Sequence, residues 1–256
     1  MEPLSYSTAL FAEASEITTR GALGWTLVVA VAIAAIHLLV PRLQPFVKAH
    51  EELLNSIGRG LAVAYTFLYL FHEMCVGSKL LGPKLHLLVL LGFLVYYGVE
   101  HVVETQVSDA ADDPSNPMVR LQFRVLILLK WVYSWLIIYA LPEAITSEGI
   151  HAITMIIAIS LHILHDDVEL ATRFERHYSH FGRYLLASAP IVGWVCDLFM
   201  FEEDLRFSKI LMALLAGSIL YTTFSGEFRE HRKSRFKWFL FGVLIYIVLY
   251  FLSEFD

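Results

Sequence analysis

Eight apolar runs, each near the length that a helix needs to cross a bilayer, constrain this chain more than any other feature. A hydrocarbon core of about 30 Å requires roughly 20 apolar residues in helical conformation. The connections between the runs are short, so no separate soluble domain is expected. We predict an all-α, polytopic integral membrane protein with a single transmembrane domain over residues 1–256, an eight-helix bundle. The predicted spans are 21–40, 60–76, 85–103, 123–141, 149–164, 184–200, 210–224 and 238–252.

Composition agrees with a membrane location and excludes one class of function. The chain is 57% hydrophobic and only 17% charged, whereas soluble domains carry about 25% charged residues. Its net charge of -6 argues against a basic nucleic-acid-binding protein. Cys75 and Cys196 stand in apolar surroundings without a metal or disulfide spacing. We therefore expect the chain to contact the lipid bilayer and not nucleic acid. The sequence leaves open whether it forms a homodimer.

The distribution of lysine and arginine predicts the orientation. Basic residues gather in the connections after the first, third, fifth and seventh spans and are sparse in the others. Short cytoplasmic loops carry the excess of lysine and arginine in membrane proteins. Both termini are therefore predicted to lie on the non-cytoplasmic side, which agrees with an even number of spans.

A stripe of ionisable residues ends the fifth predicted span. His162, His165, Asp166 and Glu169 follow one another at i, i+3, i+4 and i+7, so they share one face of a helix. Two imidazoles and two carboxylates on one face suit a divalent transition metal such as zinc. The alternative is that the helix has left the bilayer there and that these side chains are in water.

Other polar residues interrupt the apolar runs. Tyr139 and Glu143 flank Pro142 at the end of the fourth span, where proline is predicted to break or kink the helix. Lys130 lies within the same span and is predicted to snorkel or to pair inside the bundle. His72 and the next residue, Glu73, end the second span. Carboxylates at helix ends are often simply interfacial, and that alternative stays open.

Several segments resemble the ZIP (Zrt/Irt-like) family of divalent-metal transporters. YALPEA, at residues 139–144, is similar to the HNxPEG-type motif of that family's fourth helix, and HILHDD, at 162–167, to the HExPEG-type motif of its fifth. The runs AVAYTFLYLFHEM, GRYLLASAPIVGW and LLAGSILYTTFSGEF are similar to its second, sixth and seventh spans. The resemblance implies eight spans, both termini outside, and a metal site in the fourth and fifth helices.

The resemblance also implies a set of metal ligands. Carried over position by position, ligand chemistry is kept at Glu143, at His162 and, with a conservative replacement, at Asp166. His165 replaces the proline of the fifth-helix motif and adds an imidazole. The leading hypothesis is a transporter that moves zinc or a similar divalent ion across a membrane, binds one ion at these four residues and is not an enzyme. Supporting residues would be Tyr139, Glu169, His72 and Glu73.

Two alternatives remain. Tyr139, Ala140 and Ile163 stand where the family has His, Asn and Glu. These departures favour a non-transporting membrane protein that keeps the fold but has a degenerate metal site. The second alternative is an integral-membrane zinc-dependent hydrolase, which would need His72, His162 and His165 together and therefore the second and fifth spans side by side.

Overall fold

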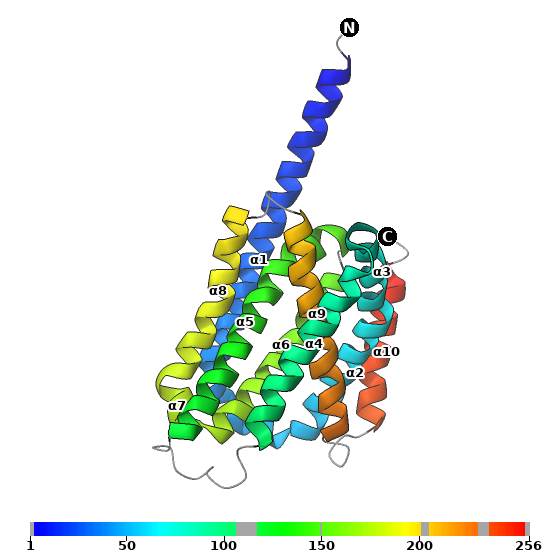
Figure 1. Ribbon diagram of the computed structural model, residues 1–256. Helices are drawn as coiled ribbons and strands as arrows, with labels where there is room; N and C mark the ends of the chain where they lie inside the picture. The colour runs from blue at the N-terminus through cyan, green and yellow to red at the C-terminus, as the bar shows by residue number, and fades with distance from the viewer. Residues whose placement is uncertain (1–2, 106–116, 149, 201–204, 230–235, 254–256) are drawn as a thin grey trace.

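The computed structural model describes residues 3–105, 117–148, 150–200, 205–229 and 236–253. All regular structure in this part of the chain is helical, as predicted (Figure 1). Two π-helical segments, η1 (Thr66–Leu70) and η2 (Tyr178–Gly182), interrupt the α-helices. The α-helices are α1 (Pro3–Ala49), α2 (Glu51–Tyr65), α3 (Phe71–Leu81), α4 (Lys84–Thr105), α5 (Pro117–Glu148), α6 (Ile150–Arg173), α7 (Glu175–His177), α8 (Arg183–Met200), α9 (Leu205–Arg229) and α10 (Phe236–Ser253).

Within the described residues, three helices are long and apolar enough to cross a membrane. They are Gly21–Ala49 of α1, Lys84–Val103 of α4 and Pro117–Thr146 of α5. Two shorter apolar helices cover Lys209–Ser225 and Phe236–Leu252. Many large apolar side chains point outward from the bundle, as expected for a surface that meets lipid and not water.

Prolines lie inside two of the helices without ending them. α1 continues past residue 40 through Pro41 and Pro45, and its first part stands clear of the bundle (Figure 1). α5 likewise continues through Pro142 to Glu148, so the helix is not broken there. A proline ring removes one backbone donor from a helix. Neighbouring groups must therefore satisfy the carbonyls that the prolines leave without a partner.

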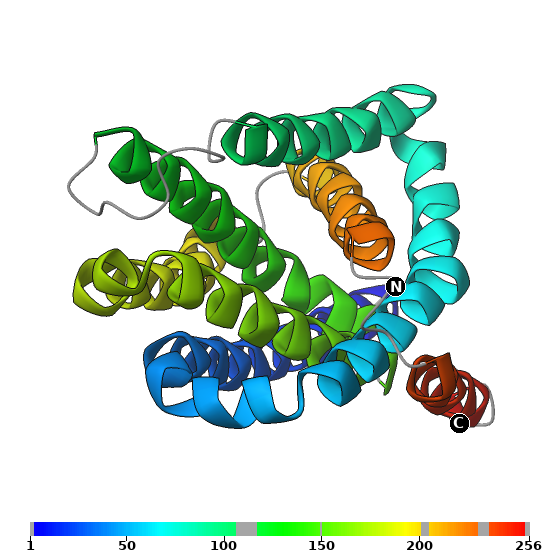
Figure 2. The same cartoon turned by 90° about the horizontal axis from the view of Figure 1, so that it is seen from below.

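Glycines allow two helix pairs to approach at backbone distance. A Cβ at Gly217 of α9 would lie 2.0 Å from the carbonyl oxygen of Val89, and one at Gly92 of α4 would lie 2.2 Å from that of Leu214. The pair α2 and α10 uses Gly60 and its counterpart Gly242 in the same way. Small residues at such crossings are typical of helix packing in membranes. Viewed along the bundle, α9 lies beside α4, and α10 lies at the outer edge beside α2 (Figure 2).

The remaining contacts bring α5 and α6 together inside the bundle. α1 packs against α5, α6 and α8, while α6 also contacts α2. The largest apolar core includes Ile33 of α1, Ile138 and Leu141 of α5, and Ile163 of α6, all of them buried. The polar residues predicted to form a site therefore lie on helices that face the interior.

Candidate functional site

Lys130 of α5 and Asp166 of α6 form an ion pair inside the bundle. Lys130 Nζ lies 2.5 Å from Asp166 Oδ2, and the two side chains are only 13% and 18% exposed. His162, one turn earlier on α6, has its Nε2 atom 3.7 Å from the same carboxylate oxygen. Lys130 thus pairs within the bundle, one of the two outcomes that its position predicted. A predicted metal ligand, Asp166, is neutralised here by a lysine.

A polar cavity adjoins this ion pair. Besides Lys130 and Asp166, its walls include Glu100 of α4 and Glu169 and Arg173 of α6. The cavity thus brings three carboxylates and two cationic groups into one place within an apolar bundle. Ionisable residues inside a membrane usually face such a cavity or the bundle interior, and they often mark an ion pathway.

Aromatic side chains lie next to one of these carboxylates, Glu100. Tyr221 of α9 donates a hydrogen bond from Oη to Glu100 Oε2 at 3.0 Å. The rings of Tyr96 and Tyr221 lie 5.5 Å apart, and those of Tyr96 and Tyr133 lie 5.9 Å apart. Tyr133 in turn meets His162 edge to face at 6.1 Å. A row of aromatic rings therefore connects Glu100 with His162 of α6.

Two imidazole nitrogens on α6 are buried without a hydrogen bond. Among the described residues, His162 Nε2 and His165 Nδ1 have no hydrogen-bond partner. Buried polar atoms in proteins are nearly always hydrogen-bonded, so each exception calls for an explanation. Neutral imidazole nitrogens are common metal ligands. These two atoms have unused capacity to bind a ligand beside Asp166.

Glu143 lies away from these residues. Its Oε1 atom contacts Lys209 Nζ at the start of α9. Glu143 is ten residues further along α5 than Tyr133, the residue that meets His162, and ten residues of helix span about 15 Å. The structure therefore does not bring Glu143 together with His162. Within the described part of the chain, no three His, Cys, Asp or Glu side chains lie close enough to hold a metal ion.

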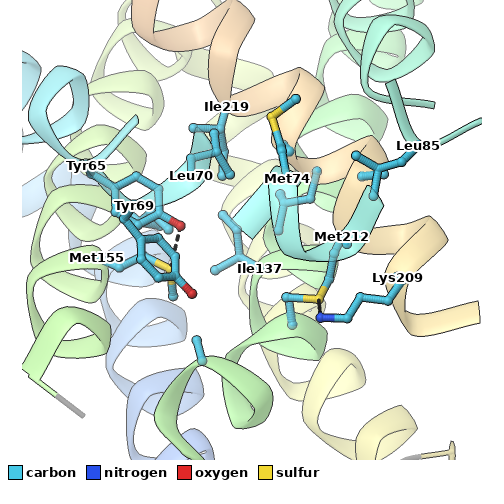
Figure 3. Close-up of a pocket in the computed structure, with 17 residues that line it drawn as sticks. Tyr65, Tyr69, Leu70, Met74, Leu85, Ile137, Met155, Lys209, Met212 and Ile219 are labelled. Atoms are coloured by element: carbon cyan, nitrogen blue, oxygen red, sulfur yellow. Dashed lines mark hydrogen bonds between the residues drawn. The ribbon is translucent and has the colours of Figure 1, made fainter. Parts of the chain in front are cut away.

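Lys209 borders a second, apolar cavity. Figure 3 shows its walls, with Tyr65 and Met155 on one side and Met212 beside Lys209. Tyr65 Oη donates to Met155 Sδ at 3.2 Å. The Lys209–Glu143 ion pair therefore lies next to a mostly apolar space, apart from the polar cavity at Asp166.

The supporting residues that the sequence predicted are dispersed. Tyr139 is buried and stacks on Trp135, with ring centroids 5.8 Å apart. Glu169 is exposed at the polar cavity. His72 is exposed on α3, and the side chain of Glu73 lies outside the described residues. α2 does pack against α6, but the exposed position of His72 gives no support to a hydrolase site that joins it to the histidines of α6.

A second polar cluster was not predicted from the sequence. His37 Nδ1 of α1 lies 2.6 Å from Asp167 Oδ2 of α6, and Tyr178 Oη lies 2.8 Å from the same oxygen. On the other side of the ring, His37 Nε2 lies 3.4 Å from Ser134 Oγ of α5. The order carboxylate, imidazole, hydroxyl is that of a hydrolase triad. Ser134, however, is only 1% exposed, so no substrate reaches its hydroxyl, and we interpret the cluster as structural.

Proline explains one contact of this cluster. Pro41 has no N–H group, so it cannot donate to the carbonyl of His37 one turn earlier in α1. Tyr178 Oη lies 3.1 Å from that carbonyl oxygen and donates to it and to Asp167 with its single proton. The sequence signal for this cluster was a lone histidine four residues before a proline in an otherwise apolar run.

Comparison of the sequence with known protein families finds no matching family, and comparison with curated proteins finds no matching relative.

Proposed function

We propose that this chain is a ZIP-like, multi-pass membrane transporter of a divalent metal ion, zinc or a similar one, with eight crossings and both termini on the non-cytoplasmic side. Three long apolar helices support the membrane location. The other predicted spans also coincide with helices. α1 begins and α10 ends at the same end of the bundle (Figure 1), which suits an even number of crossings.

The observation that carries the proposal is the Lys130–Asp166 ion pair at the edge of a cavity that Glu100 and Glu169 also line. In this proposal Lys130 is a resident cation that neutralises Asp166 while no metal is bound. An arriving metal ion displaces the ammonium group from Asp166, and Lys130 turns toward Glu100 or Glu169. The displaced charge then keeps a carboxylate partner, which limits the free energy needed to separate a buried ion pair.

The two unpartnered imidazole nitrogens support the same proposal. His162 Nε2 and His165 Nδ1 would join Asp166 as ligands once Lys130 moves away and the three side chains close around the ion. The ligand set is then two neutral imidazoles and one carboxylate, which suits zinc. Glu143, paired with Lys209, belongs to a different level of the bundle and would not share this ion.

The test is the zinc content and zinc uptake of the purified protein. Zinc bound per protein is measured by mass spectrometry, and uptake of radioactive zinc is measured in proteoliposomes. We expect His162→Ala to lower both more than His165→Ala does. His86→Ala, which removes an exposed imidazole from α4, is the matched control. If His162→Ala behaves like His86→Ala, the metal site does not exist at these residues.

A second candidate function is favoured by three side chains. Tyr139, Ala140 and Ile163 are all buried, at 6%, 7% and 4% exposure. They stand where the ZIP family has polar ligands, and none of the three is a usual zinc ligand. In this alternative the chain keeps a ZIP-like fold but carries no metal, and Lys130–Asp166 is a permanent ion pair. Absence of zinc from the wild-type protein, together with no uptake, would support it.

A further inference from the structure

A basic cavity lies at the end of the bundle where α5 begins and α7 leads into η2. It is partly open to the surroundings of the bundle. Three arginines and two histidines contribute to its walls: Arg120, Arg124, Arg176, His177 and His180. No carboxylate is among the described side chains that line it. The cavity is separate from the Asp166 site and therefore calls for its own explanation.

The wall of this cavity is held in place by buried contacts. Tyr178, the first residue of η2, is fully buried and is anchored to Asp167. At Gly182, the last residue of η2, an added Cβ would lie 2.8 Å from Phe123 Cζ of α5. The ring of His177 also meets Phe123, with centroids 5.3 Å apart. The basic groups are therefore presented by packed elements.

Two of the three arginines carry charge that no described carboxylate neutralises. Arg124 and Arg176 are exposed, and neither makes an ion pair with another described residue. Partial burial, followed by the positive charges of Arg120, Arg176 and Arg124, lowers the pKa of His177 below its ordinary value. This end of the bundle therefore favours an anion.

Apolar groups continue from the arginines along the outer face of the bundle. Leu128, one turn beyond Arg124 on α5, and Phe181 are each 61% exposed and line the same cavity. A free anion would use the arginines but would leave these apolar surfaces in contact with water. A molecule with an anionic head and an acyl chain covers both.

We infer that this cavity binds an anionic phospholipid, with its phosphate at Arg120, Arg124 and Arg176 and an acyl chain along Leu128 and Phe181. The inference rests on the proposed membrane crossing, which puts this end of the bundle at the level of the lipid headgroups. Basic pockets between helices on the cytoplasmic side are known to receive such headgroups. The site does not depend on metal transport by the Asp166 region.

The test uses the full chain in nanodiscs of phosphatidylcholine, either alone or mixed with phosphatidylglycerol. After extraction in detergent, native mass spectrometry counts the phosphatidylglycerol that stays bound. The double variant Arg124→Gln/Arg176→Gln should bind it about thirtyfold more weakly, from the usual contribution of two basic residues at a membrane surface. The matched control is Arg42→Gln/Lys48→Gln, which removes two exposed charges from the last turns of α1. This variant should retain wild-type binding.

Two further arms separate a lipid from a free phosphate. Phe181→Ser leaves the charge unchanged and should weaken phosphatidylglycerol binding, while inorganic phosphate should not compete at concentrations that match the lipid. Equal lipid retention by the two double variants would overturn the inference. Full competition by inorganic phosphate, with no effect of Phe181→Ser, would also overturn it and would indicate a simple anion site. Zinc uptake is recorded in parallel, so that failure of the transport proposal is seen separately.

Discussion

Asp167 Oδ2 lies 2.6 Å from His37 Nδ1, and this contact joins α6 to α1 in the interior of the bundle. Both side chains are almost completely buried, at 1% and 2% exposure. The next residue back in the chain, Asp166, faces a lysine on α5 instead. Two consecutive aspartates thus connect α6 to two different helices. One of them borders the proposed transport site, while the other holds the bundle together.

Asp167→Asn is expected to destabilise the protein. The amide cannot accept from both His37 and Tyr178 as strongly as the carboxylate does, and hydrogen bonds to a charged group contribute about 1.5–3 kcal/mol each. The thermal unfolding midpoint in detergent should fall clearly below that of the wild type. Glu175→Gln, which changes an exposed carboxylate on α7, is the control. Equal midpoints for the two variants would mean that the cluster does not stabilise the fold.

Gly217→Ala is expected to separate α4 from α9. The new methyl group would meet the backbone oxygen of Val89 at 2.0 Å, and a backbone atom cannot turn aside as a side chain can. Overpacking of this kind typically destabilises by about 1–3 kcal/mol. Gly98→Ala on α4, with no atom within 4 Å of its Cβ, is the matched control and should be neutral or slightly stabilising. The yield in size-exclusion chromatography and the thermal stability of each variant would measure the difference. Similar losses in both variants would contradict the close approach of α4 and α9.

The proposed eight-crossing topology predicts that both ends of the chain are labelled from one side. Single cysteines at Ser5 and Ser253, in a background of Cys75→Ser and Cys196→Ser, should react with a membrane-impermeant reagent from the same side of the membrane. Arg124→Cys, near the start of α5, should react only from the other side. Labelling of Ser5→Cys and Ser253→Cys from opposite sides would require an odd number of crossings.

The helices could be predicted from the sequence because, in the bilayer that we propose, the backbone has little choice of conformation. An apolar run in a bilayer must satisfy its own N–H and C=O groups, so runs such as 85–103 and 123–141 are helical wherever they pack. The helix ends were less predictable. Pro142 does not end α5: the helix continues to Glu148, and Thr146 Oγ1 donates to the carbonyl oxygen of Pro142 in the turn that follows.

The partners of the polar residues could not be predicted in the same way. Spacing correctly put His162, His165 and Asp166 on one face of α6, and it put Asp167 about 100° away. Spacing cannot say which helix each face meets, because helix neighbours depend on side-chain packing across the whole bundle. For this reason Lys130, and not Glu143, faces Asp166, and His37 lies opposite Asp167.

Lys130→Gln separates the two proposed functions. If Lys130 is a resident cation that competes with a metal ion for Asp166, its removal should raise zinc affinity by about tenfold or more, since a nearby positive charge opposes the ion. Transport turnover should fall, because nothing then displaces the bound ion. Affinity should still weaken as the pH falls, because a protonated imidazole cannot ligate the ion. Lys209→Gln, which breaks a second lysine–carboxylate pair, is the matched control and should leave zinc affinity unchanged.

Isothermal titration with zinc would measure both variants. If Lys130→Gln binds no zinc and only loses thermal stability, the ion pair is permanent and the chain does not carry metal.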